Sequence, residues 1–152
     1  MILDPTCGSK MFWFDKDNPD VIFGDIRREE HVLSDGRKLV IRPDVQMDFT
    51  ALPFVDRVFQ MVVFDPPHLI NGGDNSWMVK KYGRLPKDWK MNVWMGFFEC
   101  WRVLRKNGTL IFKWNETQLP VSDIIKMTGP PLFGHKSGKN SKTHWLCFIK
   151  QH

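Results

Sequence analysis

The sequence predicts an α/β fold, in which a mostly parallel β-sheet ends with an antiparallel pair of strands. Short apolar runs alternate with a segment of helical periodicity, and several of these runs stop at an aspartate. Neither an internal repeat nor a low-complexity linker interrupts the chain. With 152 residues and a hydrophobic content of 42%, the chain is long enough to bury a real core. We therefore expect a single domain over residues 1–152.

The first half of the chain supplies most of the parallel strands. Four apolar runs are predicted to be strands of the main sheet: residues 1–3, 21–25, 45–47 and 58–64. The first run leads into a tight turn at residues 4–9, and a helix is expected over residues 10–14. Residues 31–42 place an Asp35-Gly36 turn between two extended runs, which favours a small hairpin that projects from the sheet.

The second half contains the predicted long helix. Apolar side chains recur at intervals of three and four residues over residues 89–106, and Gly108 is the expected stop signal. The remaining elements follow in order: a strand at residues 109–114, a short helix at 121–127, a Gly-Pro-Pro breaker at 129–131, and an antiparallel strand pair formed by 132–133 and 143–149.

The composition favours a cytoplasmic protein with an anionic partner. The formal net charge of +5 suits nucleic acid, although many unrelated proteins share that balance. Cys7, Cys100 and Cys147 lie far apart and lack metal-ligand spacing, so we expect buried, reduced thiols and no metal site. No apolar stretch approaches the length of a membrane span and no charged-then-apolar leader is seen, so no membrane association is expected.

The run Asp65-Pro66-Pro67-His68, directly after an apolar strand, is the most informative motif. It places a carboxylate and a rigid carbonyl at the end of a buried strand, because proline fixes the backbone angle of the turn. Two such acceptors suit an NH2 group, whose protons must be held while the nitrogen is drawn towards tetrahedral geometry. The alternative is an ordinary turn that ends a strand.

The turn Asp4-Pro5-Thr6-Cys7-Gly8-Ser9 is the second motif. Gly8 can adopt backbone angles closed to other residues and lets a ligand approach the main chain, while a following helix would offer free N–H groups to a carboxylate. The alternative is a plain connection between a strand and a helix.

Together these motifs resemble the class I S-adenosylmethionine-dependent methyltransferases, specifically the amino-methyltransferase branch with an Asp-Pro-Pro-aromatic motif. The strings at residues 7–15, 64–69 and 108–116 are similar to small methyltransferase-like proteins of bacteriophages and prophages. The resemblance implies a Rossmann-like sheet with helices on both faces and S-adenosylmethionine as cofactor. It also implies cofactor contacts from Asp4, Cys7, Gly8, Lys10, Asp25, Asp48 and Phe49, and catalytic roles for Asp65, Pro66 and His68.

Sheet topology explains how these scattered residues could form one site. Ligands of open parallel sheets collect beyond the carboxyl ends of the strands, where the strand order reverses. Asp4 and Asp65 would then share one crevice, and Asp25 would accept ribose hydroxyls. The resemblance further implies that Asp48 binds the adenine amine. Each of these acids also has a plain surface-turn alternative.

Two residues depart from the pattern of the family. His68 stands where relatives often carry Tyr, Phe or Trp, and imidazole stacks less extensively on an acceptor base. Lys10 stands where the broader class usually has a third glycine, so it either pairs with the methionine carboxylate or is a solvated lysine.

Residues 69–88 form a long segment without a clear periodicity, which is typical of a functional or a mobile loop. Its cations and aromatics would suit phosphates and an extruded base. The run 113–116, at the end of a strand, is expected to line the acceptor side, although Trp114 is equally suited to the core. The predicted substrate contacts are Pro67, Trp77, Lys80, Lys81, Tyr82, Arg84, Trp114 and Asn115.

The sequence therefore predicts a methyltransferase that modifies an amino nitrogen, with the adenine N6 amine of DNA or RNA as first candidate. No stretch is large enough for a separate target-recognition region, so we expect low sequence specificity, or base readout supplied by a partner or a second copy in a homodimer. Two alternatives stay open: the same chemistry on a protein side-chain amide or a small molecule, and a non-catalytic module that binds the cofactor.

Overall fold

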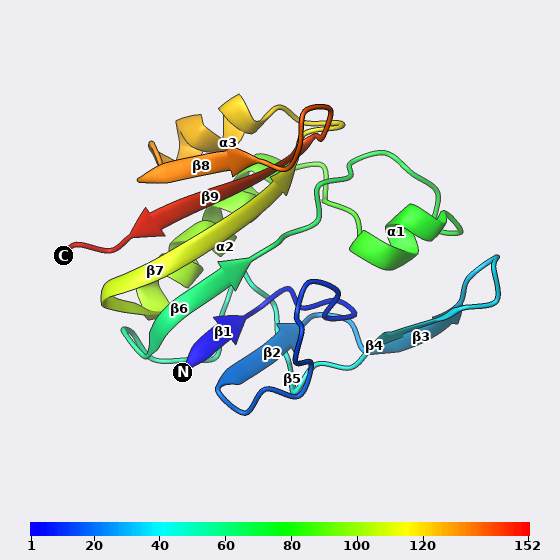
Figure 1. The fold of residues 1–152 in the computed structure, drawn as a ribbon, viewed down its shortest axis with the longest axis horizontal. Coiled ribbons are helices and arrows are strands. Elements are labelled where there is room, and N and C mark those ends of the chain that lie inside the picture. Colours follow the sequence, from blue (N-terminus) through cyan, green and yellow to red (C-terminus); the bar gives the residue numbers. More distant parts are fainter.

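A computed structural model describes all residues from 1 to 152 and shows a seven-stranded, mostly parallel sheet with helices (Figure 1). The strand order is β5-β2-β1-β6-β7-β9-β8. The strands are β1 (Ile2–Asp4), β2 (Val21–Asp25), β5 (Val45–Gln46), β6 (Phe59–Phe64), β7 (Leu104–Asn115), β8 (Phe133–Lys136) and β9 (Thr143–Ile149). Strand β9 runs antiparallel to both of its neighbours, which confirms the antiparallel pair predicted at the end of the chain.

The pairing register brings the ends of the parallel strands to one edge of the sheet. Strand β1 lies between β2 and β6, with Asp4 opposite Phe23 and Leu3 opposite Val62. The residues that follow these strands therefore start from neighbouring positions. A separate antiparallel hairpin, β3 (Glu29–Val32) with β4 (Lys38–Ile41), projects beyond this edge (Figure 1).

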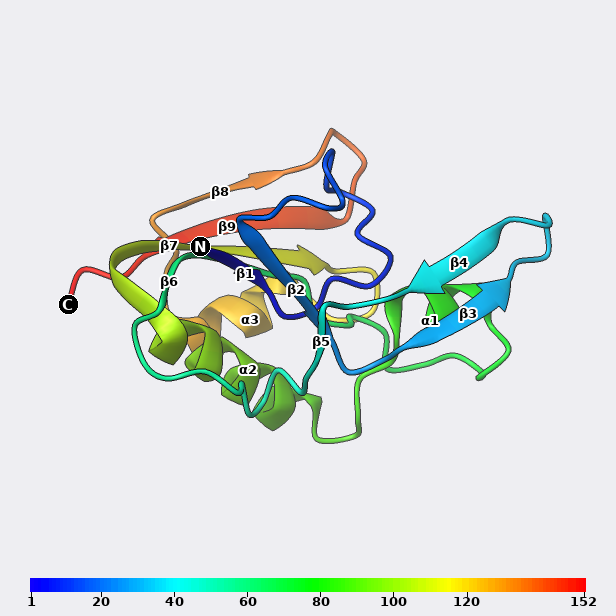
Figure 2. The same ribbon diagram turned by 90° about the horizontal axis from the view of Figure 1, so that it is seen from below.

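The two longer helices pack on the same face of the sheet. Helices α2 (Trp89–Val103) and α3 (Val121–Thr128) lie together on one side in Figure 2, over a core of 18 buried residues. Phe64, Phe112 and Trp114 are fully buried in that core. The expectation of helices on both faces is wrong, because the opposite face carries the irregular loop 5–20 instead of a helix (Figure 2).

The helix expected over residues 10–14 does not form. Gly8 and Lys10 both have left-handed backbone angles, with φ of 51° and 57°, and helical continuation is impossible through such residues. The loop is held by its aromatic side chains instead. Trp13 packs edge-on against Phe23 of β2 with ring centroids 5.2 Å apart, and Phe12 meets Trp145 of β9 at 5.8 Å.

Helix α2 ends at Val103, earlier than the predicted end at residue 106. Lys150, which is buried just beyond β9, reaches the end of this helix. Its Nζ donates hydrogen bonds to the carbonyl oxygens of Trp101 and Leu104 at 2.7 and 2.8 Å. These carbonyls belong to the group that a helix leaves without partners, so Lys150 caps α2 from a distant part of the chain.

The segment 69–88 contains one short helix, α1 (Trp77–Tyr82), which lies beyond the ends of the parallel strands (Figure 1). The chain before and after this helix is joined by a hydrogen bond from the Leu85 N–H to the Leu69 carbonyl oxygen at 2.7 Å. Arg84 donates to the Gly72 carbonyl oxygen at 2.6 Å. None of the helices has both the length and the apolar character needed to cross a membrane.

Candidate active site

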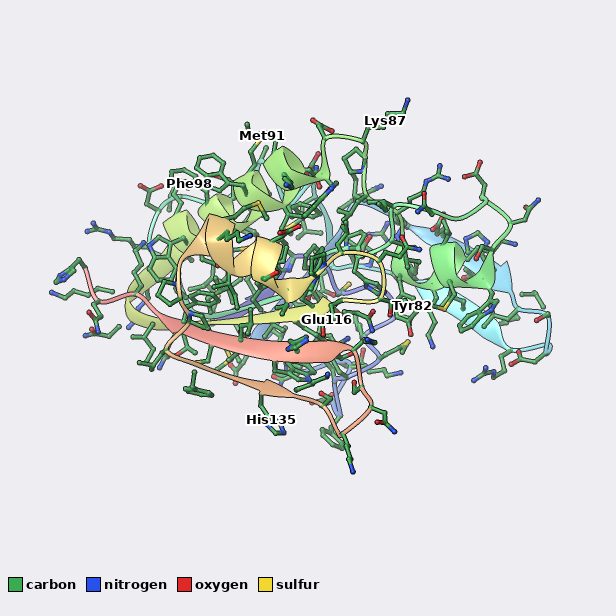
Figure 3. The ribbon with its side chains drawn as sticks, turned by 90° about the horizontal axis from the view of Figure 1, so that it is seen from above. Tyr82, Lys87, Met91, Phe98, Glu116 and His135 are labelled. Atoms are coloured by element: carbon green, nitrogen blue, oxygen red, sulfur yellow. The ribbon has the colours of Figure 1, made fainter.

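Three adjoining cavities open at the ends of β1, β2, β6 and β7, and Asp65 and Tyr82 line all of them. The first cavity lies over the Gly8 turn, the second reaches Asp25 and Phe49, and the third reaches Asn115 and Thr143. We call them the turn, β2 and acceptor cavities. Tyr82, the last residue of α1, is labelled in Figure 3.

The two sequence motifs are joined by a direct hydrogen bond. The backbone N–H of Asp65 donates to Oγ1 of Thr6 at 2.8 Å. Thr6, Cys7 and Gly8 line the turn cavity together with Asp65 and Pro66. The structure therefore brings the turn after β1 and the Asp-Pro-Pro turn into one cleft.

Asp25 shapes the Gly8 turn from the end of β2. Its Oδ2 accepts the Gly8 N–H at 2.9 Å, and its Oδ1 accepts the Arg27 N–H at 2.9 Å. The Cys7 N–H donates to the Gly24 carbonyl oxygen at 2.8 Å. Asp25 also lines the β2 cavity, so it is placed both to support the turn and to face a ligand.

Asp4 lies beneath the cleft and lines none of the three cavities. Its Oδ2 accepts the Trp13 Nε1–H at 2.7 Å, and its Oδ1 accepts the Thr6 N–H at 3.1 Å. Burial raises the pKa of Asp4 to about 7, against the lowering effect of these hydrogen bonds. Asp4 thus anchors the loop 5–20 and the turn, and the predicted direct contact with the cofactor is not present in this geometry.

Asp65 forms an ion pair with Lys113 of β7, with Oδ2 and Nζ 3.0 Å apart. Burial raises the pKa of Asp65, and the positive charge of Lys113 opposes that rise. Lys113 is itself enclosed by rings, with Nζ 5.2 Å from the Phe12 centroid and 5.6 Å from the Trp145 centroid. No hydrogen bond from the protein reaches Oδ1 of Asp65, which leaves that oxygen for a ligand.

The side chains at the end of β7 point alternately to the acceptor cavity and to the core. Lys113 and Asn115 line the acceptor cavity, whereas Trp114 points into the core, where it is fully buried and donates Nε1–H to the Leu119 carbonyl oxygen at 3.0 Å. Trp114 is therefore a core residue and the predicted substrate contact is wrong. Because side chains of a strand point to alternate faces, burial of Trp114 in the core would place Lys113 and Asn115 on the other face of β7.

His68 and Tyr82 form the aromatic side of the acceptor cavity. Their ring centroids are 5.4 Å apart with a tilt of 51° between the planes. Burial, followed by the charge of Lys113, lowers the pKa of His68 to about 4. The imidazole is therefore neutral near pH 7 and can stack or accept a hydrogen bond without adding charge. Asn115 Nδ2 donates to Thr143 Oγ1 at 3.2 Å on the opposite side.

The β2 cavity contains Asp25, Phe49 and Pro67 but not Asp48. Asp48 is exposed, and its Oδ1 accepts both the N–H and the Oγ1–H of Thr50, at 2.8 and 2.7 Å. This local turn holds the carboxylate away from the cavity. Phe49, packed edge-on against Phe64 at 5.3 Å, is the residue after β5 that the cavity presents to a ligand.

Arg27 is a site residue that was not predicted. It lines both the turn and the β2 cavities, and its Nη1 donates to the Lys80 carbonyl oxygen at 2.8 Å. Since its backbone is bonded to Asp25, Arg27 ties α1 to the end of β2. A cation two residues after a strand-end acid was the available signal in the sequence.

The other predicted residues are divided between the cleft and its surroundings. Lys10 is turned away from the cleft: its Nζ donates to the Lys16 carbonyl oxygen at 2.8 Å and lies 4.0 Å from the Phe23 centroid. Lys81 lines the turn cavity and Arg84 lines the β2 cavity. Trp77 lines a neighbouring groove, while Lys80 contributes its carbonyl to Arg27 and lines none of the three cavities.

Comparison with known proteins supports the fold. No protein-family model matches the chain, and no curated protein matches it. Among solved structures, the PH0226 protein from Pyrococcus horikoshii OT3 superimposes with a TM-score of 0.60 at 14% sequence identity, and the match covers 98% of this chain and 81% of that one.

The fold is an α/β fold with a Rossmann-like sheet. At this identity the likeness concerns the fold alone, and the irregular loop 5–20 includes residues 10–14, where a helix was expected. No group of three or more His, Cys, Asp or Glu side chains is arranged to hold a metal ion.

Proposed function

We propose that the protein is an S-adenosylmethionine-dependent N-methyltransferase whose acceptor is an amino nitrogen, with the adenine N6 amine of DNA or RNA as the first candidate. The single observation that carries this proposal is the shared cleft of the Gly8 turn and Asp65, joined through Thr6 Oγ1. A methyltransferase-like fold is compatible with this cofactor. In such folds ligands bind beyond the carboxyl ends of the strands, where this cleft lies.

The residues of the cleft fit the proposed cofactor in their chemistry. Asp25 offers carboxylate oxygens to ribose hydroxyls, and Phe49 offers an apolar face to a purine ring. Arg27 and Lys81 are the cations of the turn cavity that suit an amino-acid carboxylate, in place of the predicted Lys10. When bound there, the cofactor supplies an electrophilic methyl group.

Asp65 and Pro66 are the residues that would orient the acceptor. The free Oδ1 of Asp65 and the Pro66 carbonyl oxygen can each accept a hydrogen bond from an N–H of an NH2 group, which directs the nitrogen lone pair towards the methyl donor. Lys113 keeps Oδ2 in place. The ionised carboxylate also stabilises the positive charge that develops on nitrogen, and the proton leaves after transfer. His68 and Tyr82 are placed to contact the ring that bears the amine.

The test is methyl transfer from a tritiated donor to separate DNA, RNA, protein and small-molecule pools, with the natural chain, Asp65→Asn and the matched control Asp20→Asn. Asp20 is exposed and precedes β2, at the end of the strand remote from the cleft. We expect Asp65→Asn to lose about 100-fold or more in rate, which is typical of a lost charge-stabilising group, while Asp20→Asn keeps its rate.

The pool that takes up label separates the remaining alternatives. Label only in the protein pool would indicate a side-chain amide as the acceptor. Label only in small molecules would indicate a metabolite. Cofactor binding by calorimetry without label in any pool would indicate a non-catalytic module. Equal rates for Asp65→Asn and the natural chain would refute the role proposed for Asp65.

A further inference from the structure

A cationic groove adjoins the cleft, bounded by the loop 5–20, the β3–β4 hairpin and α1. Six of the residues that line it are basic, and none is acidic: Lys10, Lys16, Arg37, Lys38, Arg42 and Lys81. A groove of one charge concentrates ligands of the opposite charge, because the walls exclude part of the solvent.

Part of this charge remains uncompensated. Arg37 pairs with Asp35 at 2.6 Å, and Arg42 pairs with Glu30, so these two arginines are partly neutralised by acids outside the groove. Lys16 and Lys38 are exposed and form no ion pair. Lys10 donates to a backbone carbonyl, which does not cancel its charge.

The groove also presents an aromatic surface. Trp77 of α1 lines it with 53% of its surface exposed, and Lys81 Nζ lies 5.7 Å from the Trp77 ring centroid. An exposed indole beside cations is suited to stacking on a base whose phosphate is bound near by.

The groove is continuous with the proposed active site. Gly8, Ser9, Met11 and Lys81 line both the groove and the turn cavity. A strand that lies in the groove would therefore pass the opening that leads to Asp65, where one of its bases can enter.

We propose that this groove binds the sugar–phosphate backbone of single-stranded nucleic acid, with Trp77 stacked on a base outside the cleft. The proposal rests on the proposed function for its substrate class and adds the site that holds the chain. Phosphate binding through a groove reads no base edges, so low sequence specificity follows from it. The unpaired bases of a single strand are free both to stack and to turn into the cleft.

The test is fluorescence anisotropy with a labelled single-stranded oligodeoxynucleotide over a range of salt concentrations. The groove variant is Lys16→Gln with Lys38→Gln, and the matched control is Arg105→Gln with Lys106→Gln, which removes the same charge at the start of β7. We expect the groove variant to bind roughly tenfold more weakly, with the slope of log K against log salt reduced by about 1.4. The control should keep the natural slope.

A second pair of variants examines the stacking surface. Trp77→Ala should weaken binding by about tenfold and Trp77→Phe by much less, because a phenyl ring still stacks. Trp94→Ala, at an exposed tryptophan of α2 outside the groove, should have no effect. Equal losses from the groove and control variants, or tighter binding of duplex than of single strands, would overturn the proposal.

The groove and the catalytic proposal can fail separately. If the natural chain does not bind the oligonucleotide but labels protein in an Asp65-dependent way, the groove assignment is refuted and the N-methyltransferase stands. If the groove variants lose binding while Asp65→Asn retains full transfer, the groove stands and the role of Asp65 is refuted. S-adenosylhomocysteine affinity of the groove variants, measured by calorimetry, should equal that of the natural chain.

Discussion

Lys113 is the one basic side chain paired with the proposed catalytic carboxylate. It lies 3.0 Å from Asp65 Oδ2, where its positive charge opposes the rise in the Asp65 pKa that burial causes. The ion pair was not predicted, although the run 113–116 was expected near the acceptor, because a pairing between β6 and β7 depends on sheet register. Residue order alone does not reveal which side chains contact one another across two neighbouring strands.

We predict that Lys113→Met makes methyl transfer strongly dependent on pH. Loss of the cation raises the pKa of Asp65 further, so the ionised fraction grows only at higher pH and the rising limb of the rate profile moves to the alkaline side. Lys113→Arg should keep the natural profile, and Lys106→Met serves as a control for lost charge. Superimposable profiles for Lys113→Met and the natural chain would show that the pair does not tune Asp65.

His68 supplies a prediction of stability against pH. Its pKa is about 4 in the folded chain and 6.5 when unfolded, so the unfolded state takes up a proton first as pH falls. The stability contributed by neutral His68 is present above pH 6.5 and is lost as pH falls towards 4, by roughly 3 kcal/mol at most. The free energy of unfolding of His68→Phe, relative to that of the natural chain, should therefore increase as pH falls between these limits.

Urea unfolding at several pH values measures this gain, with His135→Phe on the exposed strand β8 as control. The contribution to stability of Asp4, whose pKa is raised to about 7, changes with pH in the opposite direction. Its protonated form favours the folded state at low pH, and stability is lost as pH rises towards 7. That contribution is common to all three chains and cancels in the comparison. A constant difference between His68→Phe and the natural chain from pH 4 to 7 would contradict the prediction.

At the scale of elements, the strands were predicted more successfully than the connections between them. Apolar runs that stop at an acid identified β1, β2 and β6, because burial on both faces leaves a continuous hydrophobic signal. Residues 10–14 were wrongly predicted to be helical, since the conformation of the loop 5–20 depends on contacts of Trp13 with Asp4 and Phe23 that no local pattern encodes. The cap of α2 could not be predicted for the same reason, because Lys150, which donates to its last carbonyls, lies near the C-terminus of the chain.

We predict that Lys150→Met destabilises the fold by about 2 kcal/mol, the usual range for hydrogen bonds to a charged group. Methionine fills a similar volume but leaves the carbonyls of Trp101 and Leu104 without their donor. Lys142→Met, at an exposed position without a side-chain hydrogen bond, is the matched control. Urea titration followed by far-ultraviolet circular dichroism measures both; equal midpoints would mean that water replaces the cap.

At the scale of the whole molecule, the expectation of buried thiols is confirmed. Cys7, Cys100 and Cys147 are 4%, 0% and 5% exposed, and burial raises the pKa of each thiol. Few thiolates form at neutral pH in such settings, and the thiolate is the reactive species. The chain should therefore resist thiol reagents as long as it is folded.

We predict slow reaction of the native chain with Ellman's reagent and rapid reaction of all three thiols in concentrated guanidinium chloride. Cys7 lines the turn cavity, whereas the other two do not line the cleft, so Cys7→Ser should abolish most of the slow native reaction. S-adenosylhomocysteine should slow it in the natural chain. Rapid native labelling of Cys100 would show that α2 separates from the sheet far more often than its burial suggests.

The position of β9 between β7 and β8 also bears on how the protein is made. During synthesis, residues 104–115 emerge well before residues 143–149, which pair with them along seven positions. Until then the nascent chain exposes a long unpaired strand edge, a well-known template for association between chains. Slow translation of this interval would therefore lengthen the time during which ribosome-bound chains can aggregate or need a chaperone.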